Sequence, residues 1–402
     1  TRAIRQALNK LFAEVVAQVN GTLDDILEVS LVANPIMHHI LLGISPIELG
    51  GAPFALATDA AVEIPARELE LTINGGGRLY ILPCIAGHVG ADTAGVILSE
   101  EPQCQDQMTL LVDVGTNAEI VLGNRQRLLT CSSPTGPAFE GAQISCGQRA
   151  AAGAVERVRI DPSSLEPRFR VIGSHIWTDQ PGFAASLDQR GVTGICGSGI
   201  IEVVAEMYLA GIVSEDGVID GALRARSARI VETGRTWSYL LHDPDDDGAQ
   251  LLITQSDIRQ IQLAKAALYA GIKLLMDHMG TPDIERIRLA GAFGSHIDVQ
   301  RAMVLGLIPD CALDQVSSAG NAAGTGARIA LLNHGSRELI ESLVKRIEKI
   351  ETALEPKFQD YFVDAMAFPN KSDAFPKLFS KVVRPQPRVP EAVSGSGRRR
   401  RR

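Results

Sequence analysis

The chain has 402 residues, 45% of them hydrophobic and 21% charged, a balance typical of a globular protein with two or three domains. Its net charge of −8 combines +5 from Arg398–Arg402 with −13 from all other residues. Aromatic residues make up only 4%, which argues against a nucleic-acid partner, and no apolar run approaches the roughly 20 residues that span a bilayer, which argues against a membrane partner. The six cysteines lack C-x-x-C spacing and the first residues lack a signal-peptide pattern, so we expect reduced thiols and a cytoplasmic location.

Hydrophobic periodicity and glycine positions predict alternating helices and strands. The expected elements, in chain order, are a helix over 1–20, a strand over 27–32, a helix over 34–43, a strand hairpin formed by 69–73 and 79–82, a short helix led by 90–95, strands near 155–160 and 168–173, a long helix from 254 to 278, and helices over 297–305, 321–333 and 337–354. The long helix opens with Thr254-Gln255-Ser256-Asp257, which has the residue types of a capping box.

A turn between two apolar runs carries the strongest chemical signal. The first run ends in Asp113, and Gly115, Thr116 and Asn117 follow before the second run, which predicts a β-hairpin. Gly115 lets the backbone approach a ligand, and the polar side chains and turn N–H groups form a concavity suited to phosphate oxygens. Asp113 is placed to hold Mg²⁺, directly or through water. An ordinary hairpin turn uses the same residue types, so this segment alone leaves both interpretations open.

Two further glycine turns follow along the chain. Residues 193–201 place Gly197, Ser198 and Gly199 at the start of an apolar helix, and residues 287–296 form a strand that runs into Gly-Ala-Phe-Gly. Helix N-termini and bare glycine backbone can hold a phosphate or pack against a base. Each turn alone is weak evidence, but their order resembles that in the second half of the actin-like ATPase (ASKHA) fold of sugar kinases, heat-shock chaperones and actin. We therefore expect an α/β fold with two lobes and a cleft between them.

Several longer motifs resemble the reductive activators of corrinoid proteins. They are Asp-Val-Gly-Thr-Asn-Ala-Glu from position 113, Gly-Pro-Ala-Phe-Glu-Gly-Ala-Gln-Ile-Ser-Cys-Gly from 136, Gly-Ile-Cys-Gly-Ser-Gly from 194, Ile-Thr-Gln-Ser-Asp-Ile-Arg-Gln-Ile-Gln-Leu-Ala-Lys from 253, Gly-Ala-Phe-Gly from 291 and Gly-Asn-Ala-Ala-Gly-Thr-Gly-Ala-Arg from 320. The resemblance covers about residues 1–368. It implies an actin-like ATPase domain that the family couples to a ferredoxin domain with a two-iron two-sulfur cluster. It also implies ATP-dependent reduction of the inactive Co(II) corrinoid of a methyltransferase system to Co(I), with the corrinoid protein as partner.

The same resemblance implies roles for individual residues. The implied set is Asp113 for Mg²⁺ and catalysis, Gly115, Thr116 and Asn117 in the second phosphate hairpin, Glu140 and Gly141 near the ribose, Gly197, Ser198 and Gly199 at the helix beside the nucleotide, Gly291, Ala292 and Gly294 in the adenosine motif, and Asp92 and Thr93 in the helix that connects the lobes.

The chain also departs from the family pattern. The ferredoxin cysteines and an Asp-x-Gly-Thr-Thr segment, the first phosphate hairpin, are missing, and Ala33-Asn34-Pro35 stands where the family reads Gly-Asn-Thr. We therefore expect an incomplete first lobe at 1–105, a second lobe at 106–368 and a disordered tail at 369–402, in a fragment or a naturally truncated protein. The family's iron–sulfur cluster is not expected in this chain, and ATP should bind weakly.

Isolated reactive side chains have plainer interpretations. His38 and His39 could be metal ligands, but adjacent histidines without a spaced partner favour a structural role at a helix start. Cys146 and Cys196 could be redox-active, but free cysteines are usually buried and inert. Lys265 is expected to be a surface charge, with a nucleotide-facing position as the alternative. The arginine-rich end is a solvated tail, or docks on an acidic partner or RNA.

Three functions are open from the sequence. The first is the ATP-binding domain of a corrinoid activator, in which ATP hydrolysis is linked to electron transfer. The second is a docking module for the corrinoid protein without catalysis, and the third is a small-molecule kinase, for which no catalytic Asp or sugar-shaped pocket can be assigned. The sequence leaves open whether the chain is itself an enzyme and whether it forms a homodimer.

Overall fold

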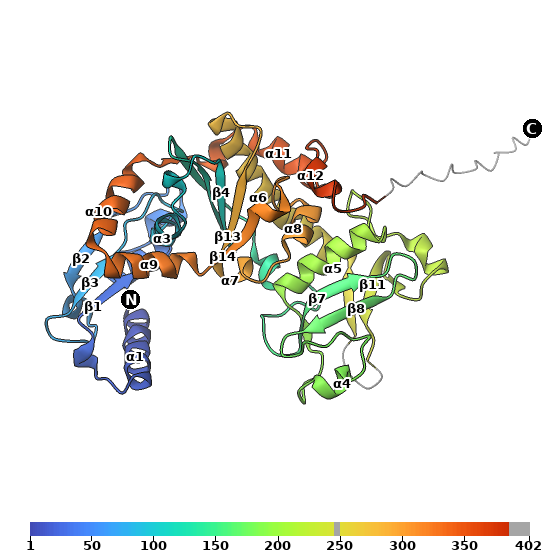
Figure 1. Ribbon diagram of the computed structural model, residues 1–402, viewed down its shortest axis with the longest axis horizontal. Coiled ribbons are helices and arrows are strands. Elements are labelled where there is room, and N and C mark those ends of the chain that lie inside the picture. The colour runs from blue at the N-terminus through green and yellow to red at the C-terminus, as the bar shows by residue number, and fades with distance from the viewer. Residues whose placement is uncertain (245–249, 386–402) are drawn as a thin grey trace, which may run out of the picture.

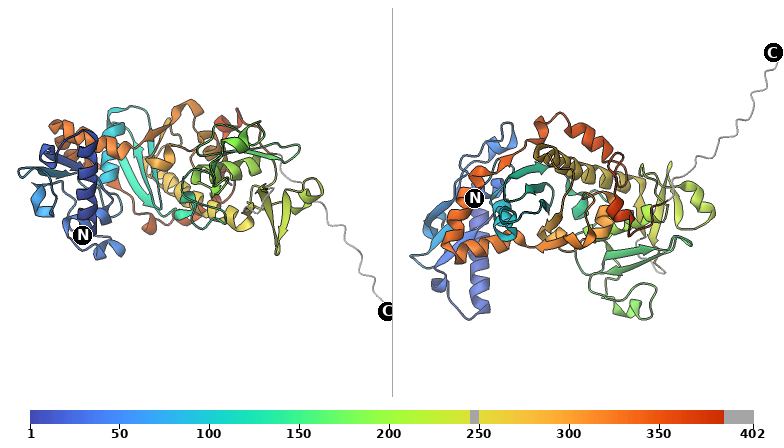
Figure 2. Two further views of the ribbon diagram at one scale, coloured as in Figure 1. Left: turned by 90° about the horizontal axis from the view of Figure 1, so that it is seen from below. Right: turned by 45° about the horizontal axis from the view of Figure 1, so that its top comes forward.

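The computed structural model describes residues 1–244 and 250–385. The molecule is elongated, with the N-terminal elements at one end, β4, β13 and β14 in the middle, and α5 with several antiparallel strands at the other end (Figure 1). Two further views show the same elongation (Figure 2). The late helices α9 and α10 return to the N-terminal end, where α9 packs on α3 and β1.

The described helices are α1 (Arg2–Gln18), α2 (Pro35–Leu42), α3 (Ala91–Glu100), α4 (Phe183–Ser186), α5 (Gly197–Leu209), α6 (Gln255–Met279), α7 (Gly291–Gly294), α8 (Val299–Leu305), α9 (Ala322–Leu332), α10 (His334–Leu343), α11 (Phe358–Asp364) and α12 (Pro376–Phe379). The described strands are β1 (Glu28–Leu31), β2 (Val62–Pro65), β3 (Arg78–Ile81), β4 (Thr109–Val114), β5 (Ala118–Gly123), β6 (Leu128–Ser133), β7 (Ala154–Ile160), β8 (Pro167–Val171), β9 (Gly194–Ile195), β10 (Ile230–Thr233), β11 (Thr236–His242), β12 (Leu251–Thr254), β13 (Arg286–Ala290), β14 (Val316–Gly320) and β15 (Glu348–Lys349). Most predicted elements are confirmed to within a few residues.

The N-terminal sheet has the order β1-β3-β2, with β3 parallel to β1 and antiparallel to β2. The predicted hairpin between 69–73 and 79–82 is wrong, because β3 pairs with β2 instead. Leu69, Leu71 and Ile73 are buried with the alternation of a strand. Their backbone, however, is bonded as a turn, since Leu71 N donates to Ala66 O and Thr72 N to the Asn9 side chain.

A six-stranded sheet with the order β14-β13-β4-β5-β6-β15 forms the middle of the molecule. Strands β4, β5 and β6 are antiparallel neighbours, whereas β13 runs parallel to β4 and β14 runs parallel to β13. Successive residues of β4 point to opposite faces. Leu110 and Val112 join the core beneath α6, and Leu111 joins the core with residues of α3, α9 and α10. Both faces of the sheet are therefore covered by helices.

The long helix α6 begins with the predicted capping box. Thr254 N donates to Asp257 Oδ2 at 2.8 Å, and Asp257 N donates to Thr254 Oγ1 at 3.2 Å. The prediction that Lys265 is a surface charge is wrong, because its side chain is fully buried in this helix. Its amine donates to the carbonyl oxygens of Ala367 and Pro369, and burial lowers the pKa of Lys265 well below its usual value. Lys265 thus fastens the C-terminal segment to α6.

The C-terminal region is more ordered than the sequence indicated. The helix expected over 337–354 ends at Leu343, and β15 then pairs with β6. The disordered tail was predicted from residue 369, but Pro376–Phe379 forms α12 and Leu378 is buried. Both carboxylate oxygens of Asp310 accept backbone N–H groups of α12 at 2.9 Å, which fixes this turn. The rest of the predicted tail, from residue 386, lies outside the described residues.

Candidate functional site

The hairpin predicted from the sequence is formed by β4 and β5. Asp113 lies opposite Glu119, and Val114 lies opposite Ala118. The turn between them is closed by Gly115 N, which donates to Asn117 O at 3.0 Å. Thr116 and Asn117 are exposed at the tip, where a ligand can reach them.

A second loop supports this turn. Thr135 Oγ1 donates to Gly115 O at 2.7 Å and to Thr116 O at 3.0 Å, and Gly136 N donates to Thr116 O at 2.9 Å. Thr116 Oγ1 donates to Glu140 Oε1 at 2.7 Å. The Glu140 carboxylate therefore lies against the hairpin tip, as required if both are to contact one ligand.

The start of α5 is linked to the same loop. Gly141 has a φ of +87° and lies so close to Gln148 that a Cβ atom would be 2.7 Å from its carbonyl oxygen. Gln148 N in turn donates to Ile195 O at 2.9 Å, two residues before the helix begins. Helix α5 also contacts the 3₁₀ turn Pro137–Glu140. The first turn of α5 is thus attached to the loop that holds the hairpin.

The residues predicted at the start of α5 differ in what they contact. A Cβ atom on Gly199 would lie 2.3 Å from Val155 O, so the absence of a side chain lets α5 pack on β7. Ser198 is buried, and its hydroxyl lies 3.3 Å from Cys196 Sγ. Ser198 and Gly199 therefore serve packing. The groups of this first turn that can bind an anion are its backbone N–H groups.

Gly291 joins the second glycine motif to the hairpin. Strand β13 pairs with β4, and Ala290 lies opposite Asp113. Gly291 follows with a φ of +81°, and a Cβ atom there would lie 2.4 Å from Asp113 Oδ1. Ala292 continues in α7, and Gly294 turns back onto β13, where a Cβ atom would lie 2.7 Å from Leu289 O. The motif and Asp113 therefore share one edge of the central sheet.

Three carboxylic acids create an unusual electrostatic environment at this edge; we call Asp92, Asp113 and Glu119 the hairpin acids. Burial, and then the charge of Asp92, raise the pKa of Asp113 to about 6. Burial, followed by Asp92 and Asp113, raises the pKa of Glu119 to about 8, and burial raises the pKa of Asp92. Within residues 1–244 and 250–385, none of the three forms an ion pair with a basic side chain. Glu119 was missed from the sequence, although its place opposite Asp113 follows from the hairpin register.

These residues fit a magnesium nucleotide. Mg²⁺ is usually held by one or two carboxylates together with waters and substrate phosphates. No group of three or more His, Cys, Asp or Glu side chains in the described part of the chain is arranged to hold a metal ion by itself. Asp113 nevertheless offers an uncompensated carboxylate beside glycine backbone, and a divalent cation would relieve its repulsion with Asp92.

The histidines and cysteines considered in the sequence analysis lie in structural positions, and the cysteines do not fit an iron–sulfur cluster. His39 Nδ1 lies 2.9 Å from Pro35 O, and its Nε2 accepts a hydrogen bond from Ala57 N at 3.0 Å. His38 is buried, and burial, with a smaller effect of His39, lowers the pKa of His38 to about 4. All six cysteines are free thiols at scattered positions, and burial raises the pKa of Cys146 to about 12. A thiol with so high a pKa is unreactive near neutral pH.

A glycine hairpin beside a strand–glycine turn and a helix N-terminus, on a sheet covered by helices, defines the actin-like ASKHA class of nucleotide-binding folds. Residues 107–379 match the family described as the C-terminal domain of RACo, the ASKHA domain, and residues 1–104 match the RACo middle region. The chain belongs to the RACo family.

Characterised relatives agree with this assignment. The corrinoid activation enzyme RamQ of Eubacterium limosum is 33% identical over 377 residues, which are 90% of this chain and 60% of that protein. The [Co(II) methylated amine-specific corrinoid protein] reductase of Methanosarcina barkeri is 25% identical over 302 residues, or 72% of this chain and 52% of that protein. The solved structure of a reductive activator for corrinoid, iron–sulfur protein superposes with a TM-score of 0.78 at 31% identity, over 92% of this chain and 57% of that one. The chain thus spans a little over half the length of these relatives.

No helix within the described ranges combines the length and the apolar character needed to cross a bilayer.

Proposed function

We propose that this chain is the ATP-binding part of a reductive activator that converts the Co(II) corrinoid of a methyltransferase system to Co(I). The observation that carries the proposal is the contact between Asp113 and Gly291, which brings two motifs more than a hundred residues apart to one edge of the sheet. Family membership supports the proposal, and so do relatives that are named as a corrinoid activation enzyme and a corrinoid protein reductase. Residues 1–105 and 106–368 would be the two lobes around the nucleotide.

Within this proposal each group has a defined task. Asp113 holds Mg²⁺, directly or through water, and the backbone of Gly115–Asn117 binds the phosphates. Glu140 and Gly141 face the ribose, the first turn of α5 lies beside the nucleotide, and the segment from Gly291 to Gly294 packs against adenosine. Small residues at these positions let the protein close on the phosphate chain.

The redox step needs a separate electron carrier in the assay. One electron passes from a reduced iron–sulfur centre, which is thereby oxidised, to Co(II), which becomes Co(I). Hydrolysis of ATP to ADP and phosphate supplies the free energy. Six free cysteines suit a reducing compartment, and we propose the cytoplasm as the place of action. The partner is a corrinoid protein, and self-association of the chain stays a prediction.

The first test is binding of MgATP to the full 402-residue chain, followed by titration calorimetry. We expect saturable binding that requires Mg²⁺ and is lost in Asp113→Ala. Glu166→Ala is the matched control, since Glu166 is a half-exposed carboxylate in an ion pair with Arg229 away from the hairpin. Absence of MgATP binding in the wild-type chain would overturn the nucleotide assignment and favour a docking module.

The second test follows cobalt absorbance with a corrinoid protein and a reduced ferredoxin. We expect ATP-dependent formation of Co(I) only when the chain is present. ATP binding together with phosphate transfer to a small hydroxy or carboxylate compound, and no effect on cobalt, would favour a kinase instead.

A further inference from the structure

A cluster of paired charges lies where α5, β7 and α8 meet. We call it the α5 cluster, and its members are Arg157, Arg159, Glu202, Glu206, Asp298 and Arg301. The three positive and three negative charges balance. The cluster is separate from the residues assigned above to the nucleotide, and the sequence analysis did not identify it.

Glu202 is the centre of this cluster. Its side chain is 0% exposed, and its two oxygens accept hydrogen bonds from Arg157 Nη1 at 2.7 Å and Arg159 Nη1 at 2.5 Å. Glu202 Oε2 also accepts a hydrogen bond from Val158 N at 2.9 Å. One helical turn later, Glu206 accepts Ile160 N at 3.1 Å. Two carboxylates of α5 therefore serve as hydrogen-bond acceptors for the edge of β7 beyond its short pairing with β9.

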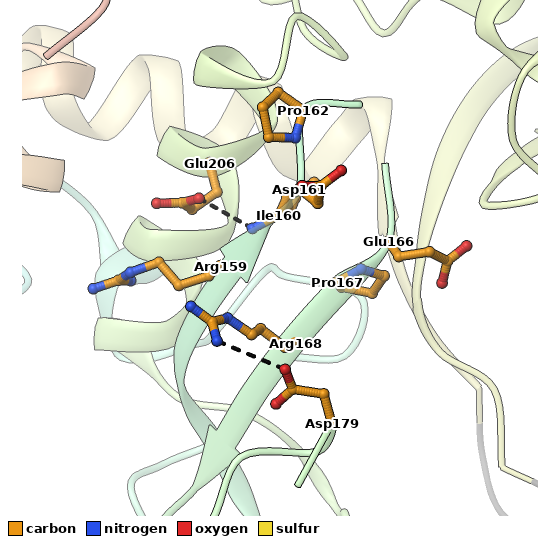
Figure 3. A pocket seen from close by; sticks show the side chains of 9 residues that line it. All are labelled: Arg159, Ile160, Asp161, Pro162, Glu166, Pro167, Arg168, Asp179 and Glu206. Atoms are coloured by element: carbon orange, nitrogen blue, oxygen red, sulfur yellow. Dashed lines mark hydrogen bonds and ion pairs between the residues drawn. The ribbon is translucent and has the colours of Figure 1, made fainter. Parts of the chain in front are cut away.

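The outer end of the cluster opens into a cavity of about 530 Å³ (Figure 3). Arg159 and Glu206 line it together with Arg168 and Asp179, which form an ion pair with each other. The lining has four acidic side chains and two basic ones, but three of the four acids, Glu166, Asp179 and Glu206, are already paired with arginines. We assign no ligand to this cavity.

The inner end of the cluster reaches the glycine motif. Arg157 Nη1 donates at once to Glu202 Oε1 at 2.7 Å and to the carbonyl oxygen of His296 at 2.8 Å. His296 lies two residues after Gly294, in the connection between α7 and α8. Asp298 caps α8 by accepting Arg301 N at 3.0 Å and also pairs with Arg159 at 3.2 Å. The connection between α7 and α8 is therefore held at His296 and at Asp298 by two arginines of β7, and Glu202 of α5 pairs with both of these arginines.

We propose that Arg157 is a positioning residue for the nucleotide. It fixes the connection that follows Gly291–Gly294 against α5, and so it sets the affinity for the adenosine half of ATP without contacting the phosphates. This inference rests on the proposed function, because it assumes that Gly291–Gly294 faces adenosine. Arg157 suits the task because a buried carboxylate orients its guanidinium, which leaves the second N–H of Nη1 for the backbone carbonyl.

The test compares Arg157→Met with Arg168→Met in the full chain. Methionine keeps most of the apolar stem and removes both hydrogen bonds, while Glu202 keeps Arg159 and Val158 N as partners. Arg168 lies on the neighbouring strand β8, is half-exposed and does not bond to 291–296 among the described residues, so it is the matched control. AMP and pyrophosphate each displace a fluorescent ATP analogue in the presence of Mg²⁺.

We expect Arg157→Met to weaken AMP binding by about tenfold, the effect typical of losing a charge-assisted hydrogen bond. Pyrophosphate binding should change by less than about twofold, and Arg168→Met should change neither. Arg157→Lys should restore part of the AMP affinity, because an ammonium group can reach one of the two acceptors. Unchanged AMP binding in Arg157→Met, or an equal loss for AMP and pyrophosphate, would overturn the proposal.

Amide hydrogen exchange separates this inference from the proposed function, since it needs no nucleotide. In Arg157→Met, exchange should accelerate at 295–297 while the core of β4 and β5 stays protected. Slow exchange at 295–297 would refute the positioning role even if MgATP binds. A third outcome is fast exchange at 295–297 in Arg157→Met combined with no MgATP binding in the wild type. Arg157 would then stabilise this connection only structurally, and both the proposed function and the nucleotide role of Arg157 would be overturned.

Discussion

The hairpin acids and the α5 cluster place acidic side chains in opposite situations. In the α5 cluster, Glu202, Glu206 and Asp298 each pair with one or two arginines. Among the described residues, Asp113 and Glu119 have no such partner, and the pKa values of both are raised by burial and by neighbouring carboxylates. Repulsion between unpaired carboxylates destabilises a fold, so their presence at the glycine edge indicates a site prepared for an external cation.

The same comparison indicates that the α5 cluster stabilises the fold and does not bind a ligand. The Glu202 carboxylate is fully buried and already accepts hydrogen bonds from two guanidinium groups and a backbone N–H, which occupy three of its about four lone-pair sites. Removal of this carboxylate should therefore destabilise the fold, whereas removal of a hairpin acid should affect binding and spare the fold. The following substitutions test this division.

The largest effect is expected for Glu202→Ala. This change leaves two arginines and Val158 N–H without their buried acceptor, and breaking such a pair costs about 3–5 kcal/mol of unfolding free energy. Urea unfolding followed by circular dichroism measures it. The control is Glu166→Ala, an ion pair with Arg229 in which the glutamate is 55% exposed, where we expect less than about 1 kcal/mol. Equal losses in the two variants would show that the α5 cluster is no more structural than a surface pair.

If the proposed function is correct, Asp113→Asn should lower ATP turnover without lowering stability. The amide keeps the shape of the side chain but cannot hold Mg²⁺, a contribution of several kcal/mol, so ATP turnover should fall by about a hundredfold or more. Because burial and Asp92 raise the pKa of Asp113 to about 6, ionisation of this carboxyl group is less favourable in the folded than in the unfolded protein, and the variant should be at least as stable as the wild type at neutral pH. Normal turnover in a folded variant would reduce Asp113 to a turn residue.

Glu119→Gln should change how stability depends on pH. The pKa of Glu119 is about 8 in the folded protein and near 4.5 when unfolded, so the folded state binds more protons between these values. Its contribution to stability is therefore present at low pH and lost as the pH rises toward 8. Glutamine does not titrate, and the unfolding free energies of wild type and variant should diverge by about 1 kcal/mol per pH unit between pH 6 and 8.

Magnesium ATP should reduce the loss of stability with rising pH in the wild type, because the cation can offset the negative charge that appears when Glu119 loses its proton. The control is Glu232→Gln, whose side chain is 62% exposed and pairs with an arginine, and its pH dependence should match the wild type. Parallel pH profiles for wild type and Glu119→Gln would contradict the raised pKa of Glu119.

The sequence identified the parts of the site that are local in the chain. Asp113, Gly115, Thr116 and Asn117 belong to one turn, so residue types alone indicate their chemistry. The contact of Gly291 with Asp113 required the parallel pairing of β13 with β4, which no local pattern specifies. The order of the glycine motifs, which resembles that of a known family, indicated that they meet at one site. Residue periodicity did not indicate it.

Polar side chains buried by distant segments could not be predicted. Glu202 and Glu206 have the i, i+4 spacing of a solvated helix face, and Lys265 reads as a surface charge for the same reason. All three are buried because their partners come from β7, α8 or the C-terminal segment. Conversely, Leu69, Leu71 and Ile73 alternate as in a strand, but Leu71 N donates to Ala66 O within a turn, and the neighbouring Thr72 N donates to Asn9 Oδ1. Alternation of apolar residues in the sequence therefore did not distinguish a strand from an irregular core segment.

A last pair of variants, which should differ little in stability, separates the position of Asp113 from its charge. Gly291→Ala places a Cβ atom 2.4 Å from Asp113 Oδ1 at a φ of +81°. Gly280→Ala is a matched control, because Gly280 has a φ of +71° and a Cβ atom there would meet no other atom within 4 Å. The left-handed backbone should cost each variant about 1–2 kcal/mol, so their unfolding free energies should agree within about 1 kcal/mol, since the flexible Asp113 side chain can rotate away. Only Gly291→Ala should lose MgATP affinity, because it displaces the carboxylate that we propose holds the cation. Equal MgATP affinity in the two variants would show that the close approach of Gly291 to Asp113 does not serve nucleotide binding.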